Sequence, residues 1–567
     1  LAADLPLPEV YREEDGEILL MGWGSTYGPI REACDRLRDK GLCASATHIR
    51  HLHPLPAGLD ELLTRFEHVF VIEMNDSGVY GHGQLATILR AHGANVAGSD
   101  RALDQGRSED KFDWLRARGV TLFAQDGSGL AEGQTLIASA AIEDTVPDIA
   151  AAKRLGCERL TRAQLLARLF NAAELPIAVG GTSGKSTVTG MTGWILADCD
   201  RDPTVMNGAV MKNFLGEEGG FASARVGAGA PFVSEVDESD GSIALFDPYI
   251  AVLTNISLDH KSMDELRDLF GEFARRATHV IWNADDRESA ALIDGLQITG
   301  VTGFGFSDGA NFRAVELEEQ PLGSRFTLEA RGKRYPVTLQ VPGRHNIANA
   351  LAALAAAEAA GIAITDAVAA IGRFEGLRRR FDVVGTAGGV TVIDDFGHNP
   401  EKIAATLRTL KAFPGRLLVF FQPHGYGPLR VMGDELAAMF AAELDADDRL
   451  FLCDPVYFGG TTDRSVGSAD ITARIEEAGG PADYVAEREE VGKRLVQLAE
   501  NGDRIVIMGA RDDTLSLDMA PPHYLRLLPA FLVRLPCTVS TCLDQPRAFV
   551  IRFDHHAQPN GIILVSQ

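Results

Sequence analysis

A glycine-rich loop between a predicted strand and a predicted helix constrains this chain more than any other feature. It reads Gly180-Gly181-Thr182-Ser183-Gly184-Lys185-Ser186-Thr187. Such a loop points backbone N–H groups and a helix N-terminus at phosphates, the lysine neutralises their charge, and the next hydroxyl can bind Mg²⁺. Val179 stands where the longer G-x-x-x-x-G-K-[ST] form has its first glycine, so the match is to a shorter Gly-Thr-x-Gly-Lys-Ser/Thr loop. The alternative interpretation is a glycine turn that precedes a lysine by chance.

Short β-rich runs alternate with amphipathic helical stretches along most of the chain, a pattern typical of α/β folds with mainly parallel sheets. We expect a buried strand at 249–255 and a further strand at 335–341, which is followed by a long alanine-rich helix. Residues 68–100 predict a βαβ unit, with a helix at 84–92 and a second strand that ends at Asp100. An acidic residue after the second strand is the layout of a nucleotide-binding domain.

Length and composition narrow the class of protein further. The 567 residues correspond to roughly three to four domains at ~150 residues each. The formal net charge of −25 argues against a nucleic-acid-binding protein, because affinity for the phosphate backbone comes from clustered Lys and Arg. Seven scattered cysteines indicate a reducing compartment rather than a disulfide framework. The sequence contains neither an apolar run of about 18 residues nor a signal peptide. It therefore predicts that no segment crosses a membrane and that the protein is cytoplasmic.

A second candidate site is acidic. The segment 235–240 reads Glu-Val-Asp-Glu-Ser-Asp, and the strand at 249–255 is followed by Asp259 and His260. The strand would deliver Asp259 and His260 to the carboxyl edge of a sheet, where ligands bind in open α/β folds. A carboxylate and an imidazole there can hold a metal beside the phosphates. The alternative is a solvated acidic loop.

Motifs across about residues 80–517 resemble the Mur ligase family, and their order and spacing are nearest to its L-alanine-adding branch. The matching residues are 181–186, Glu235, Asn255 with Asp259-His260, 343–350 (Gly-Arg-His-Asn-Ile-Ala-Asn-Ala), 374–381 (Phe-Glu-Gly-Leu-Arg-Arg-Arg-Phe), 394–400 (Asp-Asp-Phe-Gly-His-Asn-Pro) and 421–424 (Phe-Gln-Pro-His).

The resemblance implies an α/β fold with three domains: a Rossmann-like N domain for the UDP-sugar, a central P-loop ATPase domain, and a Rossmann-like C domain for the amino acid. It implies an ATP-dependent amide-bond ligase. The enzyme would join an amino acid or peptide to a UDP-N-acetylmuramate-type carboxylate through an acyl phosphate, giving ADP and phosphate. ATP and Mg²⁺ would be the cofactors, and catalysis would rest on positioning and charge neutralisation. The resemblance implies peptidoglycan biosynthesis and leaves the oligomeric state open.

The resemblance also assigns roles to residues. Those expected at ATP are Gly181, Thr182, Ser183, Gly184, Lys185, Ser186, Thr187, His345, Asn346, Asn349, Arg380 and Asp395. Those expected to be catalytic are Lys185, Glu235, His260 and Arg380, and those expected to bind Mg²⁺ are Ser186, Thr187, Glu235 and His260. Those expected at the substrates are Gly81, Gly83, Asp100, His398, Asn399, His424 and Arg430. Without the family match, a surface arginine in a run of three is an equally good interpretation of Arg380.

Two departures from the family pattern bear on the incoming amine and on the metal site. In the L-alanine-adding enzymes, arginines after Phe-Gln-Pro-His are expected to hold the amino-acid carboxylate, but here those positions are Gly425 and Pro428. A bidentate clamp is therefore missing, and Arg430 is the nearby cation left to contact the carboxylate. Arg275 and Arg276 stand where several Mur ligases have a carbamylated lysine, as expected of the L-alanine-adding branch.

The first ~90 residues resemble a different protein, the C-terminal domain of a 2-oxoacid:ferredoxin oxidoreductase α subunit. The matching residues are 18–32, 50–56 and 71–75. No cysteine cluster for an iron–sulfur centre accompanies them. His48, His51 and His53 lack a fourth ligand and favour an extended surface segment over a metal site.

Five segments are therefore expected: an oxidoreductase-like segment at 1–66, the UDP-sugar domain at 67–172, the ATP domain at 173–333, the amino-acid domain at 334–517 and an irregular tail at 518–567. Two other functions stay open. One is a Mur-like ligase for an acid outside the cell wall, such as a folate or an amino-acid polymer, and the other is a subunit of a 2-oxoacid oxidoreductase complex.

Overall fold

The described residues of the computed structural model form four β-sheets and divide into two units. The first unit contains 1–76, 383–408 and 414–523, and the second contains 77–382, 409–413 and 524–567. The described residues are 8, 10–13, 16–23, 34, 38, 43–49, 62, 65–72, 82–91, 93–104, 109–138, 146–218, 223–257, 261–423, 425–455, 464–486, 488–509 and 561–566.

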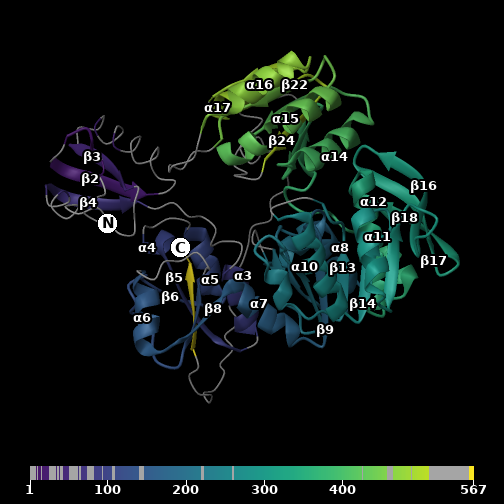
Figure 1. Cartoon of the computed structure of the whole chain (residues 1–567), viewed down its shortest axis with the longest axis horizontal. Coiled ribbons are helices and arrows are strands. Elements are labelled where there is room, and N and C mark those ends of the chain that lie inside the picture. Colours follow the sequence, from purple (N-terminus) through teal and green to yellow (C-terminus); the bar gives the residue numbers. More distant parts are fainter. Residues whose placement is uncertain are drawn as a thin grey trace, which may run out of the picture. The chain divides into compact units, whose positions relative to one another are not determined.

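A ten-stranded sheet forms the core of the second unit (Figure 1). Its order is β11-β10-β12-β9-β13-β14-β15-β16-β17-β18, and the strands from β10 to β16 are parallel. The bounds are β9 Leu175–Gly180, β10 Thr204–Met206, β11 Ala224–Arg225, β12 Pro231–Glu235, β13 Ile250–Leu253, β14 His279–Asn283, β15 Val301–Gly305, β16 Phe312–Gln320, β17 Gly323–Ala330 and β18 Lys333–Leu339.

Helices cover both faces of this sheet, which explains why β9 and β13 carry no polar side chain. On β9, Ile177 and Val179 face one core with α8 (Lys185–Asp198) and α12 (Arg344–Ala359). Ala178, between them, faces the opposite core with α10 (Met263–Arg276). The strand expected before the phosphate loop, the helix from Lys185 and the long alanine-rich helix are all confirmed.

The second unit extends further along the chain than the expected ATP domain. β18 pairs with β17 along its whole length, and α12 and α13 (Ile364–Ile371) pack in the same core as α8. The boundary expected between residues 333 and 334 therefore falls inside the ten-stranded sheet, and this unit continues to Asp382. The physical reason is that antiparallel pairing and helix packing bind 334–382 to the preceding residues.

A five-stranded parallel sheet forms the amino-terminal part of the second unit. Its order is β6-β5-β25-β7-β8. The bounds of its elements are α3 His82–Ala91, β5 Asn95–Asp100, α4 Arg101–Asp104, α5 Glu109–Ala117, β6 Thr121–Phe123, β7 Thr135–Ala138, α6 Pro147–Leu155, β8 Glu158–Thr161, α7 Arg162–Asn171 and β25 Gly561–Ser566. The expected irregular tail thus contains a strand, and β25 is the central strand of this sheet.

The βαβ unit expected over 68–100 is not formed. β4 (Phe66–Ile72) pairs in parallel with β2 (Gly16–Trp23), and the place beside β5 is taken by β25. β4 belongs to a separate sheet of order β1-β3-β2-β4, with β1 at Val10–Tyr11 and β3 at Ala44–Ile49. The sequence pattern identified a strand, a helix and a strand, but local alternation does not specify which strands pair.

A six-stranded sheet of order β19-β20-β24-β21-β22-β23 belongs to the first unit. Its strands are β19 Asp382–Ala387, β20 Val390–Asp395, β21 Leu417–Phe421, β22 Arg449–Leu452, β23 Ala482–Tyr484 and β24 Arg504–Met508. Its helices are α14 Pro400–Lys411, α15 Tyr426–Glu443, α16 Ser468–Glu477 and α17 Arg488–Leu498. The pairs from β20 through β23 are parallel, so the carboxyl ends of these strands lie at one edge.

The remaining elements are short or peripheral. They are η3 Lys212–Phe214, α9 Leu215–Glu218, η5 Ser242–Leu245 and α11 Arg287–Leu296. Across the part of the chain that the structure describes, no helix combines the length and apolar character needed to cross a membrane.

Candidate active site

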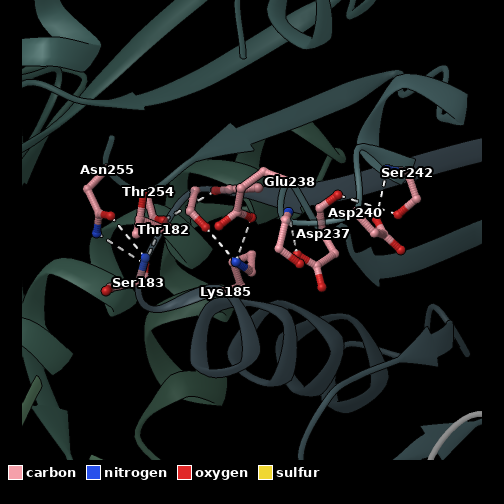
Figure 2. A network of polar contacts seen from close by, with 12 residues as sticks. Thr182, Ser183, Lys185, Asp237, Glu238, Asp240, Ser242, Thr254 and Asn255 are labelled. Atoms are coloured by element: carbon pink, nitrogen blue, oxygen red, sulfur yellow. Dashed lines mark hydrogen bonds and ion pairs between the residues drawn. The ribbon is translucent and has the colours of Figure 1, made fainter. Parts of the chain in front are cut away.

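The glycine-rich loop joins β9 to α8 and is held against the end of β13 (Figure 2). The backbone N–H groups of Thr182 and Ser183 donate to Asn255, at 3.1 Å to its carbonyl oxygen and 3.0 Å to Oδ1. The Thr254 hydroxyl donates to the Ser183 carbonyl at 2.7 Å. Two left-handed backbone positions, Gly181 at φ +128° and Gly184 at φ +88°, allow the loop to turn this tightly. Asn255 is thus a structural support of the phosphate loop.

Lys185, the first residue of α8, is oriented by two acceptors. Its Nζ donates to the Gly181 carbonyl at 2.8 Å and to Glu238 Oε2 at 2.7 Å (Figure 2). An ammonium has three N–H donors, so one remains for a phosphate oxygen. The Glu238 side chain is only 4% exposed, so this is a buried ion pair.

Glu238 is a functional candidate to which the sequence analysis assigned no role. It lies in the acidic segment after β12, three residues beyond Glu235, and β12 pairs directly with β9. That neighbouring strand order brings Glu238 to the phosphate loop. Asp237 and Asp240 accept hydrogen bonds from the backbone N–H groups of Ser239 and Ser242, which rigidifies the segment.

Glu235 ends β12 with an unsatisfied oxygen. Its Oε2 is buried and has no hydrogen-bond partner in the structure as described. A Cβ on Gly208 would lie 2.2 Å from Glu235 Oε1, so a side chain there would require the carboxylate to move. Buried carboxylate oxygens are ordinarily hydrogen-bonded or bound to a metal. The donor set of Glu235 with the Ser186 and Thr187 hydroxyls, in the first turn of α8, therefore fits a hard cation such as Mg²⁺.

The other expected metal ligand, His260, lies outside the described residues. Among the residues that are described, no three His, Cys, Asp or Glu side chains form a metal-binding group. Glu235 is thus the acidic ligand candidate that the structure places beside β9.

The adenine-side candidates lie at the start of α12, beside the phosphate loop. A Cβ on Gly184 would lie 2.7 Å from Asn349 Oδ1. The Asn349 amide donates to Asn346 Oδ1 at 3.2 Å, and the Asn346 amide donates to the Pro342 carbonyl at 2.7 Å. His345 is half-buried in the same turn. The structure therefore brings Asn349 and Asn346 to the loop that carries Lys185.

Arg380 and Asp395 fall in different units, although both were expected in the third domain. Arg380 is half-buried in the segment before β19, where a bridge joins it to Leu377, and belongs to the second unit. Asp395 ends β20, and its Oδ2 accepts from the Thr406 hydroxyl at 2.9 Å and the Gly397 N–H at 3.2 Å. Their joint action on ATP remains a prediction.

Of the expected UDP-sugar residues, Asp100 is buried at the carboxyl end of β5, Gly83 lies in α3, and Gly81 falls outside the described residues. The neighbouring Ser99 hydroxyl donates to Asp148, and the Gly127 N–H donates to the same carboxyl at 2.6 Å. Burial raises the pKa of Asp148 above its ordinary range. Sequence reasoning did not find this contact, because Ser99 and Asp148 lie 49 positions apart.

Of the amino-acid candidates, His398 and Asn399 lie between β20 and α14, in the first unit. His398 Nδ1 is 3.0 Å from the Phe396 carbonyl oxygen, and Asn399 Oδ1 accepts from the Lys402 N–H at 3.0 Å at the start of α14. Arg430 is exposed on α15. His424 is outside the described residues.

Four protein-family models match the chain, three for Mur ligase domains and one for an oxidoreductase domain. They are the catalytic domain of the Mur ligase family at 78–174, the Mur ligase middle domain at 179–357, the Mur ligase glutamate ligase domain at 379–511, and core domain II of pyruvate:ferredoxin oxidoreductase at 16–100. Both expected resemblances are confirmed, and the two overlap over 78–100.

Curated relatives and a solved structure cover most of the chain. UDP-N-acetylmuramate–L-alanine ligase of Mycobacterium sp. (strain JLS) is 35% identical over 486 residues, covering 82% of this chain and 94% of the relative. The enzyme of that name from Agrobacterium fabrum is 32% identical over 455 residues, covering 77% and 93%. The crystal structure of UDP-N-acetylmuramate–alanine ligase from Thermotoga maritima superposes with a TM-score of 0.63 at 25% identity, covering 79% of this chain and 98% of that one. The chain therefore belongs to the Mur ligase family.

Proposed function

We propose that this protein is an ATP-dependent ligase that joins the amine of an amino acid to the carboxylate of UDP-N-acetylmuramate. The observation that carries the proposal is the phosphate loop, in which Gly181 and Glu238 hold Lys185 and leave one ammonium N–H for a phosphate. The relatives' names support the acceptor. Because ATP and nucleotide sugars are made in the cytoplasm, we place the reaction there.

The reaction has two steps. A carboxylate oxygen of the acceptor attacks the γ-phosphorus of ATP and the bond to ADP breaks, which gives an acyl phosphate. The neutral amine then attacks the acyl carbon, the bond to phosphate breaks, and the nitrogen loses a proton, giving an amide and phosphate. Little covalent chemistry falls to the protein, so positioning and charge stabilisation dominate.

Each residue then has a defined role. The free N–H of Lys185 donates to the β/γ-phosphate oxygens, while the N–H groups at the start of α8 face the phosphates. Glu235, the Ser186 and Thr187 hydroxyls, and His260 would hold Mg²⁺, which supplies charge neutralisation between the phosphate and the acceptor. Arg380 and Asp395 would act on the bound nucleotide, and Arg430 would contact the amino-acid carboxylate.

The test is phosphate release with ATP, UDP-N-acetylmuramate and a panel of amino acids, each omitted in turn. Hydroxylamine tests the first step alone, because it traps an acyl phosphate as a hydroxamate without any amino acid. We expect a hydroxamate of the UDP-sugar that requires ATP. Formation of no hydroxamate, with intact fold, would refute the proposed function.

Replacing Glu235 with glutamine should raise the Mg²⁺ concentration for half-maximal activity by about 10- to 100-fold, because the neutral amide is a poorer ligand. A Mg²⁺ titration of phosphate release measures this. Glu265→Gln is the matched control: Glu265 caps α10 through Ser262 and should leave the titration unchanged. An unaltered Mg²⁺ requirement in Glu235→Gln would remove Glu235 from the metal site.

Deleting residues 1–76 should leave ligase activity within about threefold of the full chain. The reason is that β1 to β4 pair only with one another among the described strands, and the Mur ligase models match the chain from residue 78 onward. The comparison is kcat/KM for ATP and for the UDP-sugar in both chains. A folded truncation that no longer binds the UDP-sugar would show that this segment belongs to the acceptor site.

A further inference from the structure

A carboxylate and two tyrosines lie near one another at the carboxyl edge of the six-stranded sheet, on residues to which no role has been assigned. Asp454 follows β22, and Tyr484 ends β23, paired in register with Leu452. Tyr426 begins the neighbouring α15, and a Cβ on Gly467 would lie 3.8 Å from its ring. In open α/β sheets this edge is where ligands bind.

Asp454 is held in place, and within the described part of the chain no cation pairs with it. One of its oxygens, Oδ2, accepts from the Tyr484 hydroxyl at 2.8 Å. The backbone before it is anchored by the buried Ser468, whose hydroxyl donates to the Cys453 carbonyl at 2.7 Å. No ion pair to Asp454 occurs among residues of described position, whereas other carboxylates of this unit are paired, such as Asp503 with Arg416 at 2.6 Å.

The Tyr484 hydroxyl remains a donor under physiological conditions. Burial and the nearby Asp454 charge raise the pKa of Tyr484 to about 12, with a further contribution from Tyr426. The phenol therefore orients the Asp454 carboxylate without neutralising it. A fixed carboxylate with phenol rings nearby is the chemistry that recognises an organic cation.

The first turn of α15, Tyr426 to Leu429, contains no lysine or arginine, and Arg430 follows in the next turn. The two positions where arginines were expected from the family pattern are Gly425, which precedes α15, and Pro428 in its first turn. A Cβ on Gly425 would meet only Pro428 Cδ, at 3.8 Å, so the helix start leaves space. A substrate with a positively charged group would supply the charge that pairs with Asp454.

We propose that Asp454, oriented by Tyr484, binds a cationic group on the incoming amino acid, so that the ligase prefers a basic amino acid over a neutral one. The proposal rests on the proposed function and names its amine class. The amine that attacks the acyl phosphate must be neutral, so the cation in question is the second basic group of the side chain. Asp454 is thus a specificity-determining residue.

Matched amino acids test the charge alone. L-ornithine and L-norleucine differ by a terminal ammonium in place of a methyl group, and L-2,4-diaminobutyrate and L-norvaline form a shorter pair. With the full chain, ATP and UDP-N-acetylmuramate, we expect kcat/KM to be about 10- to 100-fold higher for the basic member of at least one pair. Equal use of both members in both pairs, with hydroxamate formation intact, would overturn the proposal and leave the proposed function standing.

Variants then test whether Asp454 is the residue that recognises the cationic group of the amino acid. Asp454→Asn should abolish the preference by lowering kcat/KM for the basic amino acid only, and Tyr484→Phe should reduce it by a smaller factor. Asp483→Asn, an exposed carboxylate beside Tyr484, should leave it unchanged. Arg430→Ala should weaken basic and neutral amino acids alike. An equal loss for both classes in Asp454→Asn, at an unchanged melting temperature, would assign Asp454 a general role and overturn its role in specificity.

Discussion

Replacing Lys185 with alanine should lower ATP-dependent phosphate release by on the order of 10³-fold, the cost of removing a positioned charge from a transition state that it stabilises. The lysine is oriented before the nucleotide arrives, by the Gly181 carbonyl at 2.8 Å and Glu238 at 2.7 Å. No reorganisation is needed to present its third N–H. The measurement is kcat/KM for ATP, together with ADP affinity by calorimetry.

The same substitution affects stability, because it leaves the 4%-exposed Glu238 carboxylate without its partner. Breaking a buried ion pair from one side costs about 3–5 kcal/mol. The double variant Lys185→Ala/Glu238→Gln removes both charges and should recover most of the melting temperature without recovering activity. A recovered melting temperature without recovered activity would show that the loss is catalytic and does not come from an unfolded loop.

Lys212→Ala is the matched control. Lys212 also pairs with a buried carboxylate of the second unit, Asp382, at 3.0 Å, and it is not part of the phosphate loop. We expect a lower melting temperature and a normal KM for ATP. Retained ATP turnover in folded Lys185→Ala would instead refute the assignment of the phosphate loop.

The phosphate loop was predictable because its signals are local. A strand, a glycine-rich loop, a lysine and a helix follow one another within 175–198, and each part is visible in the sequence. The supports of this loop are not local. Thr254 and Asn255 follow β13, and Glu238 lies in the loop after β12, and these two strands flank β9 on opposite sides. Only the strand order β12-β9-β13 brings them to the loop.

Strand pairing also explains the parts of the fold that were predicted incorrectly. β4 and β18 were both expected as strands, and both exist. β4 was expected beside the strand that ends at Asp100 but pairs with β2, and β18 was expected in the amino-acid domain but pairs with β17. Side-chain alternation defines the two faces of a strand but not its neighbour, so the βαβ unit and the boundary at 334 were misplaced. β25 is the extreme case, since it pairs with β5 across more than 450 residues of sequence.

Replacing Gly181 with alanine should disable nucleotide binding, mainly through a steric clash, with a loss of about 10²- to 10³-fold in kcat/KM for ATP. An added Cβ would lie 2.1 Å from the Thr254 hydroxyl oxygen and 3.0 Å from the Asn255 carbonyl oxygen. Thr254 would have to move, which would break its 2.7 Å hydrogen bond to Ser183. The strained φ of +128° adds a backbone cost of about 1–3 kcal/mol.

Gly332→Ala separates the steric effect from backbone strain. Gly332, in the β17–β18 turn, also has a positive φ, +72°, but an added Cβ there meets nothing within 4 Å. It should cost about 1–2 kcal/mol of stability and leave the KM for ATP unchanged. Thermal unfolding and ATP titration of both variants measure the two effects. If Gly181→Ala binds ATP as well as Gly332→Ala does, the contact between the loop and the end of β13 does not shape the nucleotide site. If it loses ATP while melting within a few degrees of the control, the Thr254 and Asn255 contacts set the geometry in which Lys185 meets the phosphates.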